Sequence, residues 1–306
     1  MSAVPLQISG VTKEFTASGR RHAVLAGIDL DVAAGEVVAL LGPSGCGKST
    51  LLRLAGGLDT PTTGSVRVDG RAVRGIEPRC AVVFQEPRLL PWRTLERNVA
   101  YGLPRDVTGE RARAEVAHWL SVVGLADFAK HRPRQVSGGM AQRAALARAL
   151  ARRPGVLLLD EPFAALDALT RLRMQDLLAE VQRTAGTTVL LVTHDVDEAL
   201  HLADRVVLLG PTGTAGAADL VQPAGIGHST RTGEHTSGTN HPAPAGRHTS
   251  GGDESRGTAN GRAASVRLVL GVPGIRPRDR GDAGLAALRS SLLAELGVRT
   301  PAKAAS

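Results

Sequence analysis

Residues 42–50 constrain this chain more than any other stretch of its sequence. They follow the apolar run Val37–Leu41 and open a helical run at 51–54, the context that a phosphate-binding GxxxxGK[ST] loop requires. Its glycines let backbone N–H groups turn inward around an anion, and the helix N-terminus adds roughly half a positive charge facing the same anion. The predicted nucleotide-binding residues are Gly42, Pro43, Ser44, Gly45, Cys46, Gly47, Lys48, Ser49 and Thr50.

Lys48 is the basic residue of this loop. The basic residues of the chain are mostly arginine, so a lysine at this position favours a point-charge contact with phosphate oxygens. We expect Lys48 to reach the β- and γ-phosphates and the Ser49 hydroxyl to ligate Mg²⁺. An ordinary glycine-rich turn between a strand and a helix is the alternative, and the full pattern in its correct context disfavours it.

Two adjacent carboxylates, Asp160 and Glu161, end the apolar run Val156–Leu159. At the end of a strand they can serve one site in different roles. Asp160 would hold Mg²⁺, and Glu161 would polarise the attacking water as general base. Solvated acids at a strand end would explain the pair equally well if it stood alone. Together with the phosphate loop, the pair predicts nucleotide hydrolysis.

Short apolar runs alternate with helical spacing up to about Leu209, which predicts an α/β fold with a mainly parallel sheet. Helical spacing appears at 116–123, before Gly124 as a predicted stop, and again at 174–181. The expected strands are Val37–Leu41, Ser65–Val68, Cys80–Phe84, Val156–Leu159, Thr188–Val192 and Arg205–Leu209.

The composition changes abruptly between Pro211 and Ala264, where Gly, Thr, Ser, Ala and His dominate. Such a segment buries too little apolar surface to offset its chain entropy, so we expect a disordered insertion. Four histidines recur in it, which leaves metal binding open, although no ligand spacing typical of a metal site accompanies them. A strand at 265–271 and an amphipathic helix at 285–296 are expected to follow. The predicted divisions are 1–210, 211–264 and 265–306.

Residues 136–143 read Val-Ser-Gly-Gly-Met-Ala-Gln-Arg, with a Ser-Gly-Gly core before the expected helix Met140–Ala151. With this motif the chain resembles the ATP-binding cassette (ABC) family over about residues 4–210. The resemblance implies an α/β P-loop NTPase fold of the ABC type, with a mainly parallel core sheet, an antiparallel β subdomain and a helical subdomain at about 86–153. Six motifs stand in the family's order: the phosphate loop, Gln85, Ser137–Gly139, Asp160–Glu161, Leu166–Asp167 and His194.

The same resemblance implies roles for residues outside the loop. Phe15 would stack on adenine, Gln85 would join Ser49 and Asp160 around Mg²⁺, and His194 would hydrogen-bond the γ-phosphate beside Glu161. Asp167 belongs to the D-loop. The signature residues, which are Ser137, Gly138, Gly139 and Met140, would bind the ATP of a second copy in a head-to-tail homodimer.

Two positions depart from the family's pattern. Met140 stands where many members have Gln, which removes a side-chain amide contact but leaves the backbone contacts. The D-loop reads Ala164-Ala165-Leu166-Asp167 and lacks the frequent Ser, which puts its fine contacts in doubt. Neither departure touches the expected catalytic pair.

The resemblance also implies a transporter subunit that works under a separate membrane permease. No apolar run approaches the ~20 residues of a membrane-spanning helix, and no signal peptide is expected, so we place the chain peripherally at the cytoplasmic face of the cell membrane. Leu89, Leu90 and Trp92 could contact the permease, or they could pack internally.

The string Gln85–Trp92, the Ser-Gly-Gly-Met signature and the late Pro-Arg-Asp-Arg are similar to the nitrate, sulfonate and taurine importers, whose periplasmic or lipid-anchored solute-binding protein would be an indirect partner. A soluble ABC ATPase outside transport is the alternative, but the chain has one phosphate loop and no sustained heptads. A P-loop kinase or GTPase would have no use for the signature motif. The net charge of +8 comes from scattered arginines, so no nucleic-acid partner is expected.

Overall fold

The computed structural model describes residues 2–17, 19–211 and 263–298 of the chain. These residues belong to one compact unit. The expected disordered insertion and its histidines lie, apart from the ends of the insertion, outside the described residues, and the three-part division of the chain stays a prediction.

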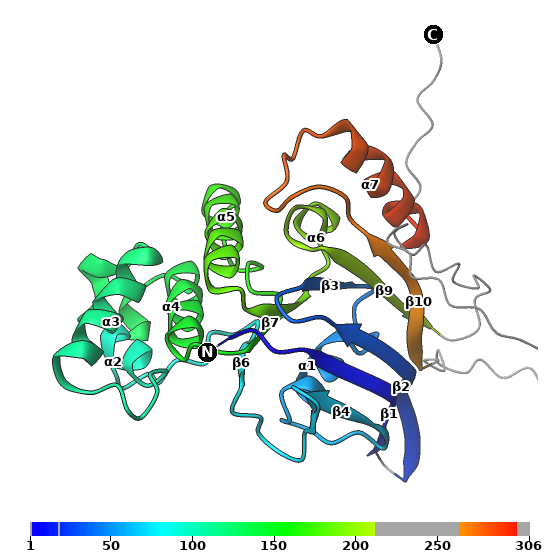
Figure 1. The fold of residues 1–306 in the computed structure, drawn as a ribbon, viewed down its shortest axis with the longest axis horizontal. Coiled ribbons are helices and arrows are strands. Elements are labelled where there is room, and N and C mark those ends of the chain that lie inside the picture. Colours follow the sequence, from blue (N-terminus) through cyan, green and yellow to red (C-terminus); the bar gives the residue numbers. More distant parts are fainter. Residues whose placement is uncertain (1, 18, 212–262, 299–306) are drawn as a thin grey trace, which may run out of the picture. The chain divides into compact units, whose positions relative to one another are not determined.

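Strands and helices alternate through most of the described chain (Figure 1). The strands are β1 Leu6–Ala17, β2 Arg20–Val32, β3 Val37–Leu41, β4 Thr63–Val68, β5 Arg71–Ala72, β6 Cys80–Val83, β7 Val156–Asp160, β8 Thr188–Val192, β9 Arg205–Pro211 and β10 Ala264–Gly271. The helices are α1 Lys48–Ala55, α2 Leu95–Ala100, α3 Gly109–Val122, α4 Gly138–Ala151, α5 Ala168–Ala185, α6 Val196–Leu202 and α7 Ala283–Glu295, with short 3₁₀ turns at Ala126–Phe128 and Pro133–Gln135.

The described strands form one mixed sheet in the order β5-β4-β1-β2-β10-β9-β3-β8-β7-β6. Its core, from β9 through β3, β8 and β7 to β6, is parallel, while β1, β2, β4 and β5 pair antiparallel. The expected parallel core and antiparallel β subdomain are therefore confirmed.

Alternate residues of the core strands serve opposite faces of the sheet, as the pleat requires. Val38 and Leu40 join the apolar cluster that contains α1, whereas Val37, Ala39 and Leu41 join the cluster that contains α5 and α6. All five side chains are at most 3% exposed. Helices thus cover both faces of the sheet, which is why the core strands are apolar throughout.

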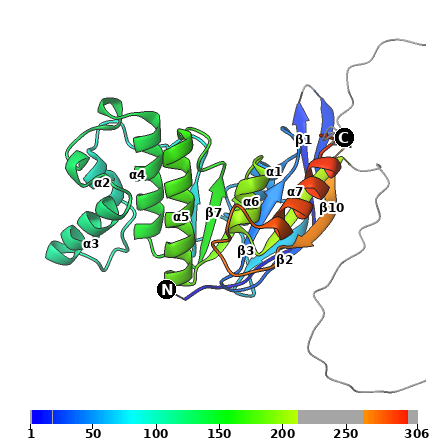
Figure 2. The same ribbon diagram turned by 90° about the horizontal axis from the view of Figure 1, so that it is seen from above.

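Helices α2, α3 and α4 pack together at one side of the core sheet (Figure 2). Asn98 of α2 is fully buried and bonds Leu90, with its side-chain oxygen 2.7 Å from the Leu90 backbone nitrogen. Helix α3 ends as predicted, because Gly124 adopts φ +66° just beyond the cap residue Val123.

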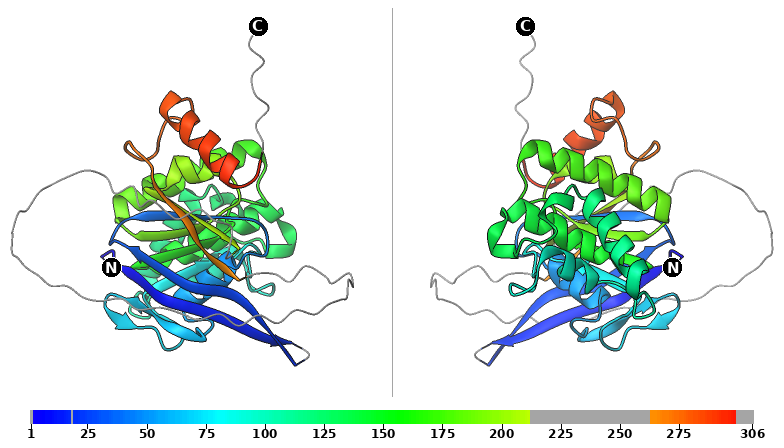
Figure 3. Two further views of the ribbon diagram at one scale, coloured as in Figure 1. Left: turned by 90° about the vertical axis from the view of Figure 1, so that its right-hand side faces the viewer. Right: turned by 90° about the vertical axis from the view of Figure 1, so that its left-hand side faces the viewer.

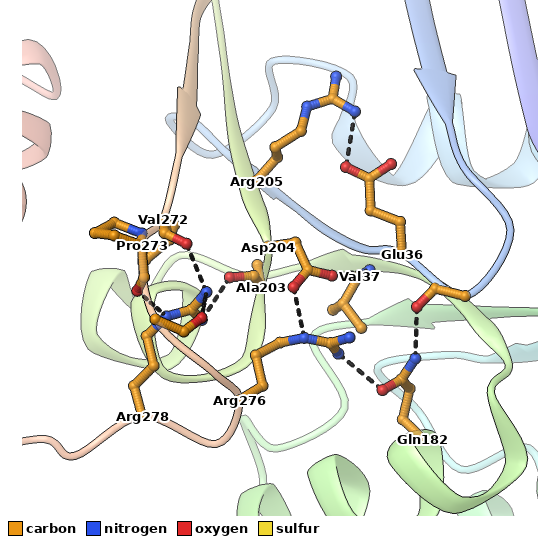
Figure 4. A network of polar contacts seen from close by, with 12 residues as sticks. Glu36, Val37, Gln182, Ala203, Asp204, Arg205, Val272, Pro273, Arg276 and Arg278 are labelled. Carbon is orange, nitrogen blue, oxygen red and sulfur yellow. Dashed lines mark hydrogen bonds and ion pairs between the residues drawn. The ribbon is translucent and has the colours of Figure 1, made fainter. Parts of the chain in front are cut away.

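The segment after β10 is held to the core by two arginines, the half-buried Arg276 and the buried Arg278. Strand β10 pairs antiparallel with β9, and α7 packs against α6 (Figures 2 and 3). Arg276 pairs with Asp204 at 2.7 Å (Figure 4). The Arg278 guanidinium donates to five backbone carbonyls, of Pro273, Leu200, Ala203, Val272 and Gly274. The segment is thereby an integral part of the described unit.

The pairing of β9 with β10 makes a deletion test possible. Pro211 and Ala264 are direct partners in the antiparallel ladder, so a two-residue Asn-Gly turn can join them in place of residues 212–263. If that stretch is a disordered insertion, the shortened chain should show the same rate of the expected ATP hydrolysis as the intact chain, and should melt at the same temperature or slightly higher.

The competing idea is that the four histidines of this stretch bind a regulatory metal. Zn²⁺ is therefore titrated against the intact and the shortened protein. A Zn²⁺-dependent change in rate that only the intact chain shows would overturn the insertion hypothesis.

Candidate active site

The carboxyl ends of the central strands meet at one edge of the sheet. Leu40 of β3 and Asp160 of β7 both pair with Val192 of β8, so the loops that follow these strands leave the sheet at the same level. Because β6 runs parallel to β7 with Val83 beside Leu159, the residues after β6 reach this edge as well. Four motifs far apart in the sequence therefore lie at this edge: the loop at 42–50, Gln85, the Asp160–Glu161 pair and His194.

The loop at 42–50 joins β3 to α1 in a conformation that its glycines permit. Gly42, Gly45 and Gly47 have φ values of +151°, +79° and +94°. A side-chain carbon at Gly47 would lie 2.7 Å from the Leu25 side chain and 2.9 Å from that of Val24, so the loop lies directly against β2. The backbone therefore curls without side chains in the way.

Lys48 begins α1, only 6% exposed, and its Nζ donates to the carbonyl oxygens of Gly42 at 2.8 Å and Pro43 at 3.0 Å. Its ammonium group is therefore held under the loop's own backbone. The remaining predicted residues follow the same path: Pro43, Ser44 and Gly45 are exposed, while Cys46, Ser49 and Thr50 are half-buried. Burial raises the pKa of the Cys46 thiol.

Ser49 and Asp160 are in direct contact. The Ser49 hydroxyl donates to Oδ1 of Asp160 at 2.7 Å. Burial raises the pKa of Asp160 above its ordinary value, and the neighbouring Glu161 acts in the same direction, so a cation here would be favourable. Gln85 follows β6 at this edge and is exposed, but among the described residues its side chain bonds neither Ser49 nor Asp160.

Glu161 and His194 lie side by side, with Nδ1 of His194 3.3 Å from Oε2 of Glu161. Glu161 has φ +46°, and its backbone N–H donates to the Val192 carbonyl at 2.9 Å. A left-handed conformation costs a glutamate free energy, and strained residues of this kind gather at functional sites.

The signature motif starts α4. Ser137 is the N-cap, and its hydroxyl accepts from the Met140 backbone nitrogen at 3.2 Å. The helix begins at Gly138, so the expectation of a start at Met140 was wrong: the capping serine places both glycines in the first turn. Among the described residues, no hydrogen bond or ion pair joins this motif to the loop at 42–50.

The D-loop lies beside the signature, since a side-chain carbon at Gly139 would approach Leu166 to 3.0 Å. Asp167 caps α5 by accepting from the Thr170 backbone nitrogen at 3.0 Å, and this bond lowers the pKa of Asp167. Phe15 lies on β1, 43% exposed, with Nζ of Lys13 4.8 Å from its ring centre. The Phe15 ring is thus partly exposed, with the Lys13 ammonium over one of its faces.

Sequence reasoning missed three polar residues around this site. Gln142 donates to the Phe84 carbonyl at 2.9 Å, next to Gln85, and Arg171 donates to the Leu166 carbonyl of the D-loop at 3.1 Å. Glu198 is buried behind His194. The spacing Asp195-x-x-Glu198 was the only available signal, and it indicates a helix cap, not a buried carboxylate.

A glycine-rich loop joins β3 to α1, and an acidic pair stands at the end of β7, which is separated from β3 only by β8. This arrangement is typical of a P-loop ATPase. The family model described as ABC transporter matches residues 25–164. A dimeric ATP-binding cassette solved in a post-hydrolysis state with ADP and Pi superimposes with a TM-score of 0.62 at 34% identity, over 66% of this chain and 93% of that one.

Curated relatives extend the match over most of the chain. It is 49% identical to an aliphatic sulfonates import ATP-binding protein of Xanthomonas axonopodis pv. citri, over 76% of this chain and 87% of the relative. A protein of the same description from Granulibacter bethesdensis is 47% identical over 92% of both chains, and a nitrate transport protein of Klebsiella oxytoca is 43% identical over 69% and 83%. The chain belongs to the ABC transporter family, as an ATP-hydrolysing cassette. No helix in its described part has the length and apolar character to cross a bilayer.

Proposed function

We propose that two copies of this chain bind ATP between them and hydrolyse it to drive import of a small anionic solute through a separate permease. The observation that carries the proposal is the convergence of Lys48, the Ser49–Asp160 contact and the Glu161–His194 contact at one sheet edge.

The nucleotide would lie over the loop at 42–50. Its phosphates would accept hydrogen bonds from the loop's backbone N–H groups and from Lys48, which would exchange its carbonyl acceptors for phosphate oxygens. Phe15 offers the exposed ring on which the adenine would stack.

The residues present fit Mg²⁺. A hydroxyl and a carboxylate oxygen 2.7 Å apart are hard oxygen donors of the kind that Mg²⁺ prefers, and the desolvated Asp160 lacks a cation at hydrogen-bond distance among the described residues. Ser49 and Asp160 would hold the ion, with the Gln85 amide as a further ligand from the end of β6. When bound, Mg²⁺ would neutralise charge on the phosphates.

Glu161 would act as general base on the attacking water, and His194 would hold Glu161 and the γ-phosphate in line. Their contact at 3.3 Å supports this assignment, because a base must be oriented before it can accept a proton in the transition state. Glu161 makes this contact from a backbone conformation with φ +46°, a strained state of the kind that gathers at functional sites.

The signature would bind the ATP of the second copy. Its first-turn N–H groups in α4 form a positive helix end that no residue of the chain's own phosphate loop contacts. Two such sites related by a twofold axis would make ATP part of a homodimer interface. Asp167 and the D-loop, packed beside Gly139, would lie at the same interface.

The permease would dock on the helical side. Trp92 is 67% exposed and Tyr101 71% exposed, and Tyr101 borders a cavity of about 250 Å³ that Phe84 and Arg148 also line. Leu89 and Leu90 are half-buried, and Leu89 packs against the core, so internal packing explains them better than a permease contact. Trp92 is the exposed member of the predicted patch.

The names of the relatives favour sulfonates or nitrate as the solute. A periplasmic or lipid-anchored binding protein would deliver this solute to the permease. The chain would then lie peripherally at the cytoplasmic face of the membrane. The soluble alternative has no observation in its favour.

Growth of the source cell tests the solute. Deletion of the gene should abolish growth on taurine or an alkane sulfonate as sole sulfur source, and leave growth on sulfate intact. If nitrate is the solute, growth on nitrate as nitrogen source should fail instead. Normal growth under both conditions would contradict this solute class.

A further inference from the structure

Glu198 is a buried carboxylate that the proposed mechanism does not use. It lies in the first turn of α6 and is 5% exposed. Its Oε2 accepts from Nε2 of Gln175 at 3.1 Å, whereas its Oε1 has no hydrogen-bond partner among the described residues. A buried carboxylate oxygen without a partner is costly and calls for an explanation, such as a bound water or a role in the site.

Glu198 shares a small cavity with the proposed catalytic pair. The cavity has a volume of about 50 Å³, and its wall includes Glu161 and His194 together with Thr193, Arg171 and Glu198. This volume exceeds the roughly 10–15 Å³ that one water requires, and several polar groups face it. Only this small polar cavity therefore separates Glu198 from the residues proposed to act on the γ-phosphate.

The loop that carries His194 is fastened to the first turn of α6. The Asp195 backbone nitrogen donates to the Thr193 hydroxyl at 3.0 Å, and Oδ1 of Asp195 accepts from the Glu198 nitrogen at 3.1 Å. The Thr193 hydroxyl oxygen accepts from the Asp195 backbone nitrogen, so the hydrogen of this hydroxyl remains available to donate to Glu198. His194 is thus flanked by Thr193, which accepts from Asp195, and by Asp195, which caps α6.

The C-terminal segment contacts the residues that hold Glu198 in place. Nη2 of Arg280 donates to Oε1 of Gln175 at 3.1 Å, and the same amide donates to Glu198. Arg278 donates to the carbonyls of Leu200 and Ala203 at the end of α6. A continuous set of contacts therefore runs from Arg280 through Gln175 to Glu198.

We propose that Glu198 is a positioning residue for ATP hydrolysis. Its ionised carboxylate holds the Thr193 hydroxyl and a water in the shared cavity, and so fixes His194 against Glu161, while Arg280 holds Glu198 through Gln175. The proposal rests on the proposed roles of Glu161 and His194. It assigns the segment after β10 a part in the chemistry of the site.

The charges around Glu198 make this role depend on pH. Burial raises the pKa of Glu198 to about 7, and Asp195 acts in the same direction, while Gln175, Thr193 and Arg171 lower it. Farther along the same elements, His201 and Arg280 both contact Asp176, and Asp197 pairs with Arg289. Glu198 is therefore neutral below about pH 7 and ionised above it, so the rate should rise through this pH.

The test is the pH profile of kcat for Glu198→Gln, which mimics the neutral acid. For a group with pKa near 7, the ionised fraction rises about tenfold between pH 6 and 8, so kcat of the unmodified chain should rise up to about that much. The variant should stay near the low-pH rate with an unchanged KM for ATP. A variant that keeps both the rise and the full kcat at pH 8 overturns the proposal.

Folding of the variant can be checked separately. A folded-state pKa above the ordinary glutamate value means that Glu198 contributes stability below about pH 4.5, and that this contribution is lost as the pH rises through about 7. Glu198→Gln escapes that loss, so at pH 8 it should melt no lower than the unmodified chain.

A second variant tests Glu198 indirectly, by changing Arg280, which contacts it through Gln175. Arg280→Gln should lower kcat several-fold at an unchanged KM, whereas Arg289→Gln, on the same segment but paired with the exposed Asp197, should not. Equal effects of the Arg280 and Arg289 variants on kcat would contradict the proposed role of Arg280. If the Glu161→Gln protein kept full activity, the proposed function would be wrong. If Glu161→Gln lost activity but the Glu198 and Arg280 variants kept it, only the role proposed for Glu198 would be wrong.

Discussion

Glu161→Gln is expected to bind ATP with ordinary affinity and to hydrolyse it about a hundred- to ten-thousand-fold more slowly. The amide keeps the size of the side chain and its place beside His194 but cannot accept a proton, and loss of a general base typically costs a factor of this order. Steady-state phosphate release gives the rate, and calorimetry gives the affinity.

The same variant should accumulate as a dimer with Mg-ATP, because ATP that is not hydrolysed would keep the two copies together. Gel filtration with and without Mg-ATP measures this. Glu180→Gln changes an exposed glutamate of α5 and should retain full hydrolysis. A Glu161→Gln protein that turns over normally and stays monomeric would remove Glu161 from the mechanism.

Lys48→Ala is expected to abolish measurable ATP binding at ordinary concentrations. Lys48 is buried under the loop, and no other lysine of the described chain contacts this loop. Removing one partner of a buried charge pair costs about 3–5 kcal/mol, which corresponds to roughly a hundred- to several-thousand-fold in affinity.

Calorimetric titration with ATP measures the loss. Lys130→Ala removes an exposed lysine of the helical region and serves as the matched control, with affinity unchanged. Equal affinities of the Lys48 variant and the unmodified chain would show that the phosphates bind elsewhere.

The parallel core could be predicted because its strands are covered on both faces, so unbroken apolar runs such as Val37–Leu41 mark them. Strands β1 and β2 were not predicted. Their apolar alternation is interrupted: the register of β1 against β2 shifts between Ile8 and Val11, with Gly10 at φ +55° between them. A bulge of this kind hides a strand from a period-of-two pattern.

The proposed site was predictable where its chemistry needs fixed residue types at fixed spacing, as in the loop that ends in Lys48. Glu198 could not be predicted, because its place behind His194 depends on how α6 packs against Gln175 of α5 and on the C-terminal segment. Contacts between segments so far apart in the sequence leave no local pattern. Sequence spacing therefore predicts the residues that would touch ATP, but not the residues that position them.

In the proposed dimer, each ATP is bound by the phosphate loop of one copy and the signature of the other. Mixing two inactive variants tests this shared binding of ATP: Lys48→Ala, which lacks the loop's charge, and Gly138→Asp, which places a carboxylate at the positive end of α4. In a mixed dimer, one site combines an intact loop with an intact signature. The mixture should therefore hydrolyse ATP although neither variant does so alone. Two folded variants that remain inactive when mixed would contradict it.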